Sequence, residues 1–178
     1  VLNVVVPSFR DDVAIEADLI EEIGRIYGYD NIPVKLMDTT FTQGGRNTKQ
    51  KIRELVRTNL TAQGLYEIYT YSFVSPSVFN QINYKANNPL RKAIKLINPL
   101  GEDQSIMRTT IIPNMLEVIS RNYNRKISEG MFYELSKVYL AEELPLKDLA
   151  YERDTLTIGI YGNLDFYDLK GIIENVMD

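Results

Sequence analysis

Helical and strand-like patterns of apolar residues follow one another irregularly along this chain, and their order is what most limits its fold. No strand–helix–strand unit repeats, and no glycine-rich phosphate loop follows a strand. The sequence therefore predicts an α+β fold with a mainly antiparallel sheet. The expected helices lie near residues 11–27, 47–63, 113–125 and 165–177, with a short one opened by Ser75-Pro76, and the expected strands lie near 2–6, 65–73, 93–97, 131–140 and 156–161.

The stretch 34–47 divides the chain into two parts. It has no apolar period and contains Thr39-Thr40 and Gly44-Gly45, which are typical of a connector. We therefore expect a partial first domain at residues 1–36 and a second domain at 37–178. A length of 178 residues suffices for one domain of ordinary size and a fragment of another, and the opening Val1 leads us to expect a piece of a longer protein.

The chain contains no cysteine and no histidine. This excludes Ser-His-Asp and Cys-His catalytic sites, zinc sites built on these residues, and disulfides within the chain. Any metal must be bound by oxygen ligands. Apolar runs are five or six residues long, far short of the roughly 20 that a membrane span needs. The lack of disulfides fits a cytoplasmic location, which we expect.

Acidic residues concentrate near the start of the chain. Residues 1–33 carry seven acids and two arginines, a local charge of −5 within a total of −4. At helical spacing Asp18, Glu21 and Glu22 fall on one arc opposite an apolar stripe, and Asp12 lies at the entrance of the helix. Two interpretations stay open, a solvated acidic face relieved by Arg25, and a site for a hard cation, either Mg²⁺ or Ca²⁺.

Basic residues gather on two later helices and allow two interpretations, solvated faces or contacts with RNA phosphates. The overall acidic charge argues against autonomous nucleic-acid binding. Tyrosines at strand spacing, Tyr66, Tyr69 and Tyr71, are expected in the core rather than on a base-stacking surface. The basic residues are Arg46, Lys49, Lys51, Arg53 and Arg57 on the helix near 47–63, and Arg121, Arg125 and Lys126 near the end of the helix at 113–125.

An ordered series of motifs resembles the β subunit of bacterial phenylalanyl-tRNA synthetase. The first two blocks are Val6-Pro7-Ser8-Phe9-Arg10-Asp11-Asp12 and Asp18-Leu19-Ile20-Glu21-Glu22-Ile23-Gly24-Arg25-Ile26-Tyr27-Gly28-Tyr29-Asp30-Asn31-Ile32-Pro33. The series continues through Tyr69-Thr70-Tyr71-Ser72-Phe73, Asn98-Pro99-Leu100, Met107-Arg108-Thr109-Thr110-Ile111-Ile112-Pro113, Asn122, Met131-Phe132-Tyr133-Glu134-Leu135 and Asp165-Phe166-Tyr167-Asp168-Leu169-Lys170-Gly171. The blocks span nearly the whole chain.

The resemblance implies that residues 1–36 are the end of a small α/β domain. In this family that domain carries a Mg²⁺ site shared with the α subunit, and its motif positions fall here on Asp12, Asp18, Glu21 and Glu22. The resemblance further implies that 37–178 is a catalytic-like module, with the antiparallel sheet and flanking helices of a class II aminoacyl-tRNA synthetase.

The same resemblance implies that this module has lost its chemistry. The second class II motif places an arginine two residues before a glutamate, where it holds the ATP phosphate, and this chain has Phe132 before Glu134. An aromatic ring cannot form the bidentate phosphate contact of a guanidinium. The third motif, rich in glycine and arginine, is absent. We therefore expect a non-catalytic part of an α2β2 enzyme, in which ATP is bound only through the α subunit and tRNA(Phe) is the substrate.

Two rival functions stay open at this point. The first rival to the scaffold is an autonomous Mg²⁺-dependent hydrolase that uses Asp12, Asp18 and Glu22. The second is an RNA-binding module that uses the basic helix faces. Metal-dependent turnover favours the first, and salt-sensitive affinity for tRNA favours the second.

Overall fold

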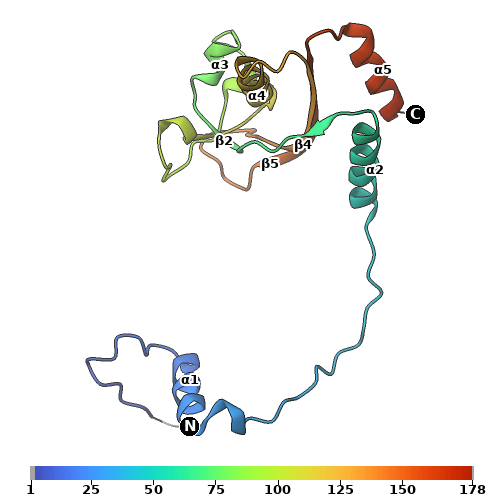
Figure 1. The fold of residues 1–178 in the computed structure, drawn as a ribbon. Coiled ribbons are helices and arrows are strands. Elements are labelled where there is room, and N and C mark those ends of the chain that lie inside the picture. The colour runs from blue at the N-terminus through green and yellow to red at the C-terminus, as the bar shows by residue number, and fades with distance from the viewer. Residues whose placement is uncertain (1–2, 178) are drawn as a thin grey trace. The chain divides into compact units, whose positions relative to one another are not determined.

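The computed structural model describes residues 3–177 (Figure 1). They fall into two compact units that divide between Gly44 and Gly45. Each unit is described by itself below. Within the described residues no helix combines the length and the apolar character that crossing a membrane requires.

The smaller unit is built around one helix, α1 (Glu16–Tyr27), followed by a 3-10 turn at Tyr29–Asn31. Gly28 ends the helix at a φ of 89°, a backbone conformation that favours glycine. The strand expected at 2–6 is wrong for residues 3–6, which pair with no described strand, and Leu2 lies outside the described residues. The described part of this unit is therefore helical rather than α/β.

The start of α1 also differs from the expectation. The apolar spacing predicts a helix from near residue 11, whereas Asp11 and Asp12 lie in a turn before the helix and Ile15 occupies the N-cap position. The cap is made from within the helix instead. The carboxylate of Asp18 accepts hydrogen bonds from the backbone N–H groups of Ala14 and Ile15, both at 2.8 Å.

The larger unit contains two small sheets. The first has the strand order β1 (Tyr66–Glu67), β4 (Gly130–Leu140) and β5 (Tyr151–Tyr161), in which β1 is parallel to β4 and β4 is antiparallel to β5. The second pairs β2 (Phe73–Val74) with β3 (Ile106–Met107) in antiparallel fashion. Most strand pairing is antiparallel, as the sequence predicts.

Two of the expected strands are interrupted. The segment 65–73 gives β1 and β2 with irregular backbone between them, because the chain leaves the first sheet there and enters the second. The segment 93–97 contributes only an isolated bridge from Lys95 to Ile106. Both segments depend on partners distant in sequence, which periodicity cannot identify.

Four α-helices complete the larger unit. The sequence predicts three of them closely, namely α2 (Thr48–Ala62), α4 (Ile112–Asn124) and α5 (Phe166–Met177). The fourth, α3 (Val78–Gln81), begins after Ser77 rather than at Ser75. Short 3-10 turns lie at Pro89–Arg91 and Glu102–Gln104.

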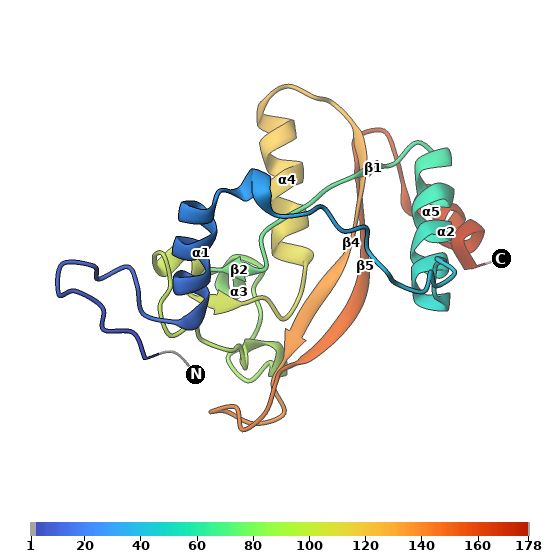
Figure 2. The same ribbon diagram turned by 90° about the horizontal axis from the view of Figure 1, so that it is seen from below.

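The core lies on both faces of the β4–β5 ribbon (Figure 2), with α2 and α5 on one side and α4 on the other. On the first side Leu60, Leu65, Tyr133 and Ile172 form a buried cluster. On the second side α4 approaches β5 closely. At Gly159 a Cβ atom would lie 2.8 Å from Met115 and 2.9 Å from Ile119.

The close contact at Gly159 gives a stability prediction. Gly159→Val suits a strand, yet its side chain would overlap Met115 and Ile119, so we expect a loss of about 1–3 kcal/mol in the free energy of unfolding. Gly171→Ala is the matched control, because nothing lies within 4 Å of its Cβ position in α5, and a gain of up to about 1 kcal/mol is expected there. Urea unfolding measures both, and equal stability of the two variants would contradict this packing.

Candidate functional site

The carboxylates singled out in the smaller unit belong to a chain of ion pairs. The guanidinium of Arg10 lies 2.7 Å from Asp12 and 2.8 Å from Glu22, so that it bridges the two side chains. The second oxygen of Glu22 accepts from Arg25 at 2.7 Å. Two arginines thus neutralise two carboxylates. Helical spacing alone identifies Arg25 and misses Arg10, whose signal in the sequence is its place two residues before Asp12.

These contacts hold three carboxylates in the ionised form. The hydrogen bond from Arg10 lowers the pKa of Asp12 to about 2. The pKa of Glu22 is also lowered, first by Arg10 and then by Arg25. The pKa of Asp18 is lowered by the N–H groups of Ile15 and Ala14, which donate to this carboxylate at the start of α1.

The four residues do not surround one point. Oxygen donors are the kind that Mg²⁺ prefers, but Asp12 and Glu22 already share Arg10, and Asp18 is bound to the backbone. Glu21 is exposed and makes no ion pair within residues 3–177. Within the same residues no three acidic side chains are arranged to hold a metal ion. The arrangement therefore does not fit a metal as it stands, and the magnesium assignment stays a prediction.

A second charged group lies deep inside the larger unit. Arg108 and Glu134 are 2 % and 1 % exposed, and their side chains meet at 2.9 Å. The guanidinium also donates to Thr70 Oγ1 at 2.8 Å, to Ser136 Oγ at 2.5 Å and to the carbonyl of Lys137 at 3.0 Å. A buried ion pair is tolerated only when such additional hydrogen bonds replace the lost water.

The carboxylate of Glu134 also has several hydrogen-bond partners. It accepts from Thr70 Oγ1 at 2.7 Å and from Ser136 Oγ at 2.8 Å, in addition to Arg108. From the sequence, Glu134 is recognisable only as a motif position, and its partners are not. The available signal was an acidic residue between apolar neighbours in a strand, which requires a counter-charge if it is buried.

Phe132 lies on the same strand two residues earlier, and therefore projects from the same face of the sheet as Glu134. Its ring stacks on Tyr161, with centroids 6.2 Å apart and an angle of 23° between the planes. The ring therefore packs on a side chain of the neighbouring strand β5 and has no hydrogen-bond donor for a phosphate.

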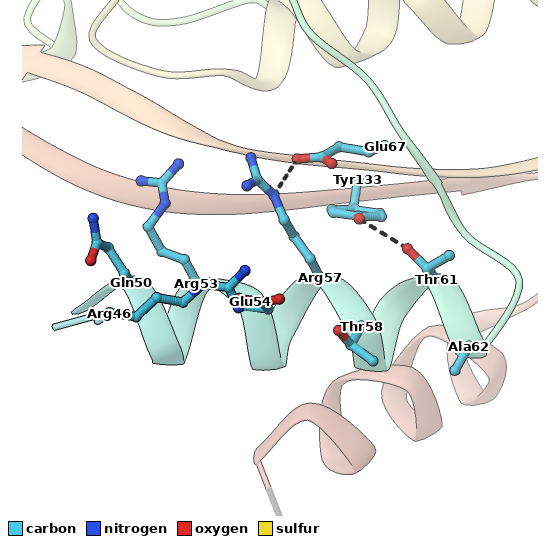
Figure 3. Close-up of a pocket in the computed structure, with 10 residues that line it drawn as sticks. All are labelled: Arg46, Gln50, Arg53, Glu54, Arg57, Thr58, Thr61, Ala62, Glu67 and Tyr133. Atoms are coloured by element: carbon cyan, nitrogen blue, oxygen red, sulfur yellow. Dashed lines mark hydrogen bonds and ion pairs between the residues drawn. The ribbon is translucent and has the colours of Figure 1, made fainter. Parts of the chain in front are cut away.

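The basic side of α2 faces a groove of about 770 Å³ beside the sheet (Figure 3). Arg57 donates to Glu67 at 2.8 Å and to the hydroxyl of Tyr69 at 3.1 Å. Arg53 donates to Asp154 at 2.8 Å and to the carbonyl of Leu135 at 3.1 Å. Two more pairs join Lys49 to Asp154 and Arg46 to Glu54. Most cations predicted on this face are therefore neutralised within the chain.

The prediction that three tyrosines of the segment 65–73 lie in the core is wrong. Tyr66, Tyr69 and Tyr71 are 71 %, 75 % and 74 % exposed. The buried tyrosine is Tyr133 on β4, whose hydroxyl lies 3.2 Å from Thr61 on α2. The segment 65–73 leaves the sheet after two residues, so its strand-like spacing does not lead to burial.

The buried ion pair gives the second prediction. Arg108→Met leaves the charge of Glu134 buried and uncompensated, so we expect a loss of about 3–5 kcal/mol in the free energy of unfolding. Adding Glu134→Leu removes that charge and should recover at least about half of the loss. Urea unfolding of the two single variants and the double variant measures the coupling. Additive losses would contradict the pairing.

Two family models match the chain. The phenylalanyl tRNA synthetase beta chain CLM domain matches residues 32–178, and the tRNA synthetase B5 domain matches residues 1–29. Among curated proteins, the phenylalanine--tRNA ligase beta subunits of Clostridium tetani and Clostridium acetobutylicum are 44 % and 40 % identical over 99 % of this chain. The chain spans 22 % of the length of each of these relatives.

Solved structures support the fold independently. Two structures of a pyrrolysyl-tRNA synthetase from Desulfitobacterium hafniense match 74 % of this chain, with TM-scores of 0.57 and 0.60. They are 18 % and 16 % identical, and the match covers 45 % and 47 % of those chains. The larger unit thus has a tRNA synthetase-like fold, as expected from its motifs. With the family models covering both parts of the sequence, the chain belongs to the phenylalanyl-tRNA synthetase beta chain family.

Proposed function

We propose that this chain is a non-catalytic structural module of a phenylalanine-tRNA ligase β subunit. In this proposal it supports an α subunit that joins phenylalanine to tRNA(Phe) with ATP, within an α2β2 enzyme. Its relatives are named as β subunits of this ligase, and the chain belongs to their family. The module contributes a folded surface that keeps the active subunit in place, and no reacting group.

The main support for this proposal is that Glu134 is buried and that its carboxylate is hydrogen-bonded by other side chains of the protein. The residue is 1 % exposed, and its carboxylate accepts hydrogen bonds from Arg108, Thr70 and Ser136. A catalytic carboxylate must reach substrate or water, and this one reaches neither without unfolding its surroundings. Phe132 gives further support because it offers no charge to a phosphate at the position where class II enzymes have arginine.

Packing on the same face of the ribbon, where Gly159 lies directly opposite Phe132, also supports a structural role. Gly159 on β5 allows Met115 and Ile119 of α4 to approach the backbone directly. The helix therefore fills space above the strand, and ATP would compete with it for this face of β5.

The RNA-binding alternative gains little from the geometry. Arg53 and Arg57 hold α2 against the rest of the unit through Asp154 and Glu67, so their charges are already balanced. Arg121 pairs with Glu117 one turn earlier in the same helix, α4. Phosphate binding at these positions would require breaking each pair.

The scaffold proposal is tested in the assembled enzyme with full-length subunits. The double variant Arg108→Met with Glu134→Leu removes both buried charges while keeping the volume similar. If Glu134 has no part in the chemistry, kcat for aminoacylation should stay within about twofold of wild type in assembled enzyme. Assembly and folding are checked by light scattering and circular dichroism before the assay.

The same assay would reveal a catalytic role of Glu134 if it had one. Loss of a participating acid or base typically costs about 10²–10⁴-fold, so a fall of that size in folded, assembled double variant would contradict the proposal. Arg108→Met alone is the informative comparison. It should lower the yield of assembled enzyme through instability, while the kcat of the assembled fraction stays unchanged.

The RNA alternative has its own test. Replacing Arg53 and Arg57 together by glutamine should leave the salt dependence of tRNA(Phe) binding to the assembled enzyme unchanged, because neither arginine contacts phosphate in this proposal. If each arginine did bind a phosphate, the substitutions would reduce the slope of log K against log salt by about 1 per residue. Such a reduction would favour the RNA-binding function. Circular dichroism controls for loss of the ties between α2 and the sheet.

A further inference from the structure

A second groove of the larger unit has a volume of about 580 Å³, and residues of β2, α3 and α4 line it (Figure 2). Phe132 and Glu134 are not among the lining residues, so this groove is separate from the positions of the class II motif. A volume of this size suits a small organic molecule. The lining residues that matter most below are Tyr69, Tyr71, Phe73, Asp103, Asn114 and Glu117.

The wall of this groove contains a hydrogen-bond acceptor that lacks a donor. Asn114, in the first turn of α4, is 8 % exposed. Its Nδ2 donates to the carbonyl of Tyr71 at 3.3 Å, whereas its Oδ1 has no partner. Among the buried side-chain nitrogen and oxygen atoms that the structure describes, this Oδ1 is the one without a hydrogen bond. An unsatisfied buried acceptor costs free energy, so a group that donates to it would be bound favourably there.

The charges around the groove favour a cation over an anion. The lining contains two carboxylates, Asp103 and Glu117, and one guanidinium, that of Arg121. Arg121 pairs with Glu117 at 2.7 Å, but both side chains are more exposed than buried, so this pair is weak. Asp103 makes no ion pair within residues 3–177. The groove therefore has an excess of negative charge.

The start of α4 does not reverse this preference, although the N-terminus of a helix commonly binds anions. The N–H of Ile112 already donates to Thr110 Oγ1 at 3.3 Å, and Pro113 has no N–H to offer. Asn114 adds an unpaired acceptor at the same turn. An anion would thus find few donors here and would be repelled by the carboxylates.

Two exposed aromatic rings also line the groove. Tyr69 and Tyr71 are 75 % and 74 % exposed, although both belong to the folded unit. Arg57 donates to the hydroxyl of Tyr69 at 3.1 Å, and Asn114 donates to the backbone of Tyr71. Such rings attract ammonium and guanidinium groups through their negatively polarised faces. The aromatic residues are therefore held in place without being used in the core.

We infer that this groove binds a small organic cation of the ammonium or guanidinium class. Its N–H groups donate to Oδ1 of Asn114, Asp103 balances its charge, and Tyr69 and Tyr71 contact it through their rings. Cations of this class carry several donors and no acceptor, which matches a wall in which acceptors are in excess. The inference goes beyond the scaffold proposal and does not depend on it, because it concerns the groove alone.

The probe for the test is capped arginine, N-acetyl-arginine methylamide, and saturation-transfer NMR measures its binding to the assembled full-length enzyme. Capped citrulline has nearly the same shape without the charge, and should bind at least about fivefold more weakly. Asp103→Asn should weaken the binding of capped arginine about threefold, and Asn114→Leu at least about fivefold. Glu102→Gln is the matched control. It removes the same charge from the same 3-10 turn outside the groove, and should leave the affinity unchanged.

Binding at other sites of the enzyme is the signal that remains when Asp103→Asn and Asn114→Leu are combined, and it is subtracted. Circular dichroism shows whether each variant is folded. Asp103→Asn carries the test if Asn114→Leu does not fold, because Asp103 lies exposed on a turn. Binding of capped arginine that both folded variants leave unchanged would overturn the inference. Equal binding of the two capped amino acids, or no binding by wild type, would overturn it as well.

Discussion

The ion pair between Arg108 and Glu134 determines how the larger unit is assembled. Two charges removed from water destabilise a fold unless every contact around them is made, so this pair fixes its neighbours in position. The backbone of Arg108 also makes two hydrogen bonds, one as donor and one as acceptor. Its N–H donates to the carbonyl of Ser72 at 2.9 Å, and its carbonyl accepts from the N–H of Tyr139 at 3.0 Å. The residue therefore connects the small sheet to β4.

In the scaffold proposal, the same ion pair gives Glu134 a structural role in place of a catalytic one. A glutamate placed for work on a substrate needs access, whereas Glu134 serves as a buried acceptor for Arg108, Thr70 and Ser136. The proposal also draws on Phe132, which stacks on Tyr161 at the position where the resemblance to class II enzymes leads us to expect an arginine. In the scaffold proposal, the fold is retained while the side chains that would act on ATP are replaced by packing.

Local signals in the sequence were enough for the elements that rest on local interactions. The helix α2 follows from its apolar period and from Asn47, whose side chain and that of Gln50 cap each other's backbone at 2.9 Å. The strand β4 follows from its apolar run. The break between β1 and β2, the exposure of Tyr69, and the bridging role of Arg10 could not be predicted in this way, because each depends on a partner that only the fold brings close.

Our main proposal is that the module carrying Glu134 forms no active site, and active-site titration of the full α2β2 enzyme tests it most directly. Enzyme, phenylalanine and ATP are mixed with pyrophosphatase, and the bound phenylalanyl-adenylate is counted per tetramer. We predict one adenylate for each αβ pair, all of it lost when the active site of the α subunit is inactivated. Two adenylates per pair, or adenylate that remains after that inactivation, would contradict the proposal.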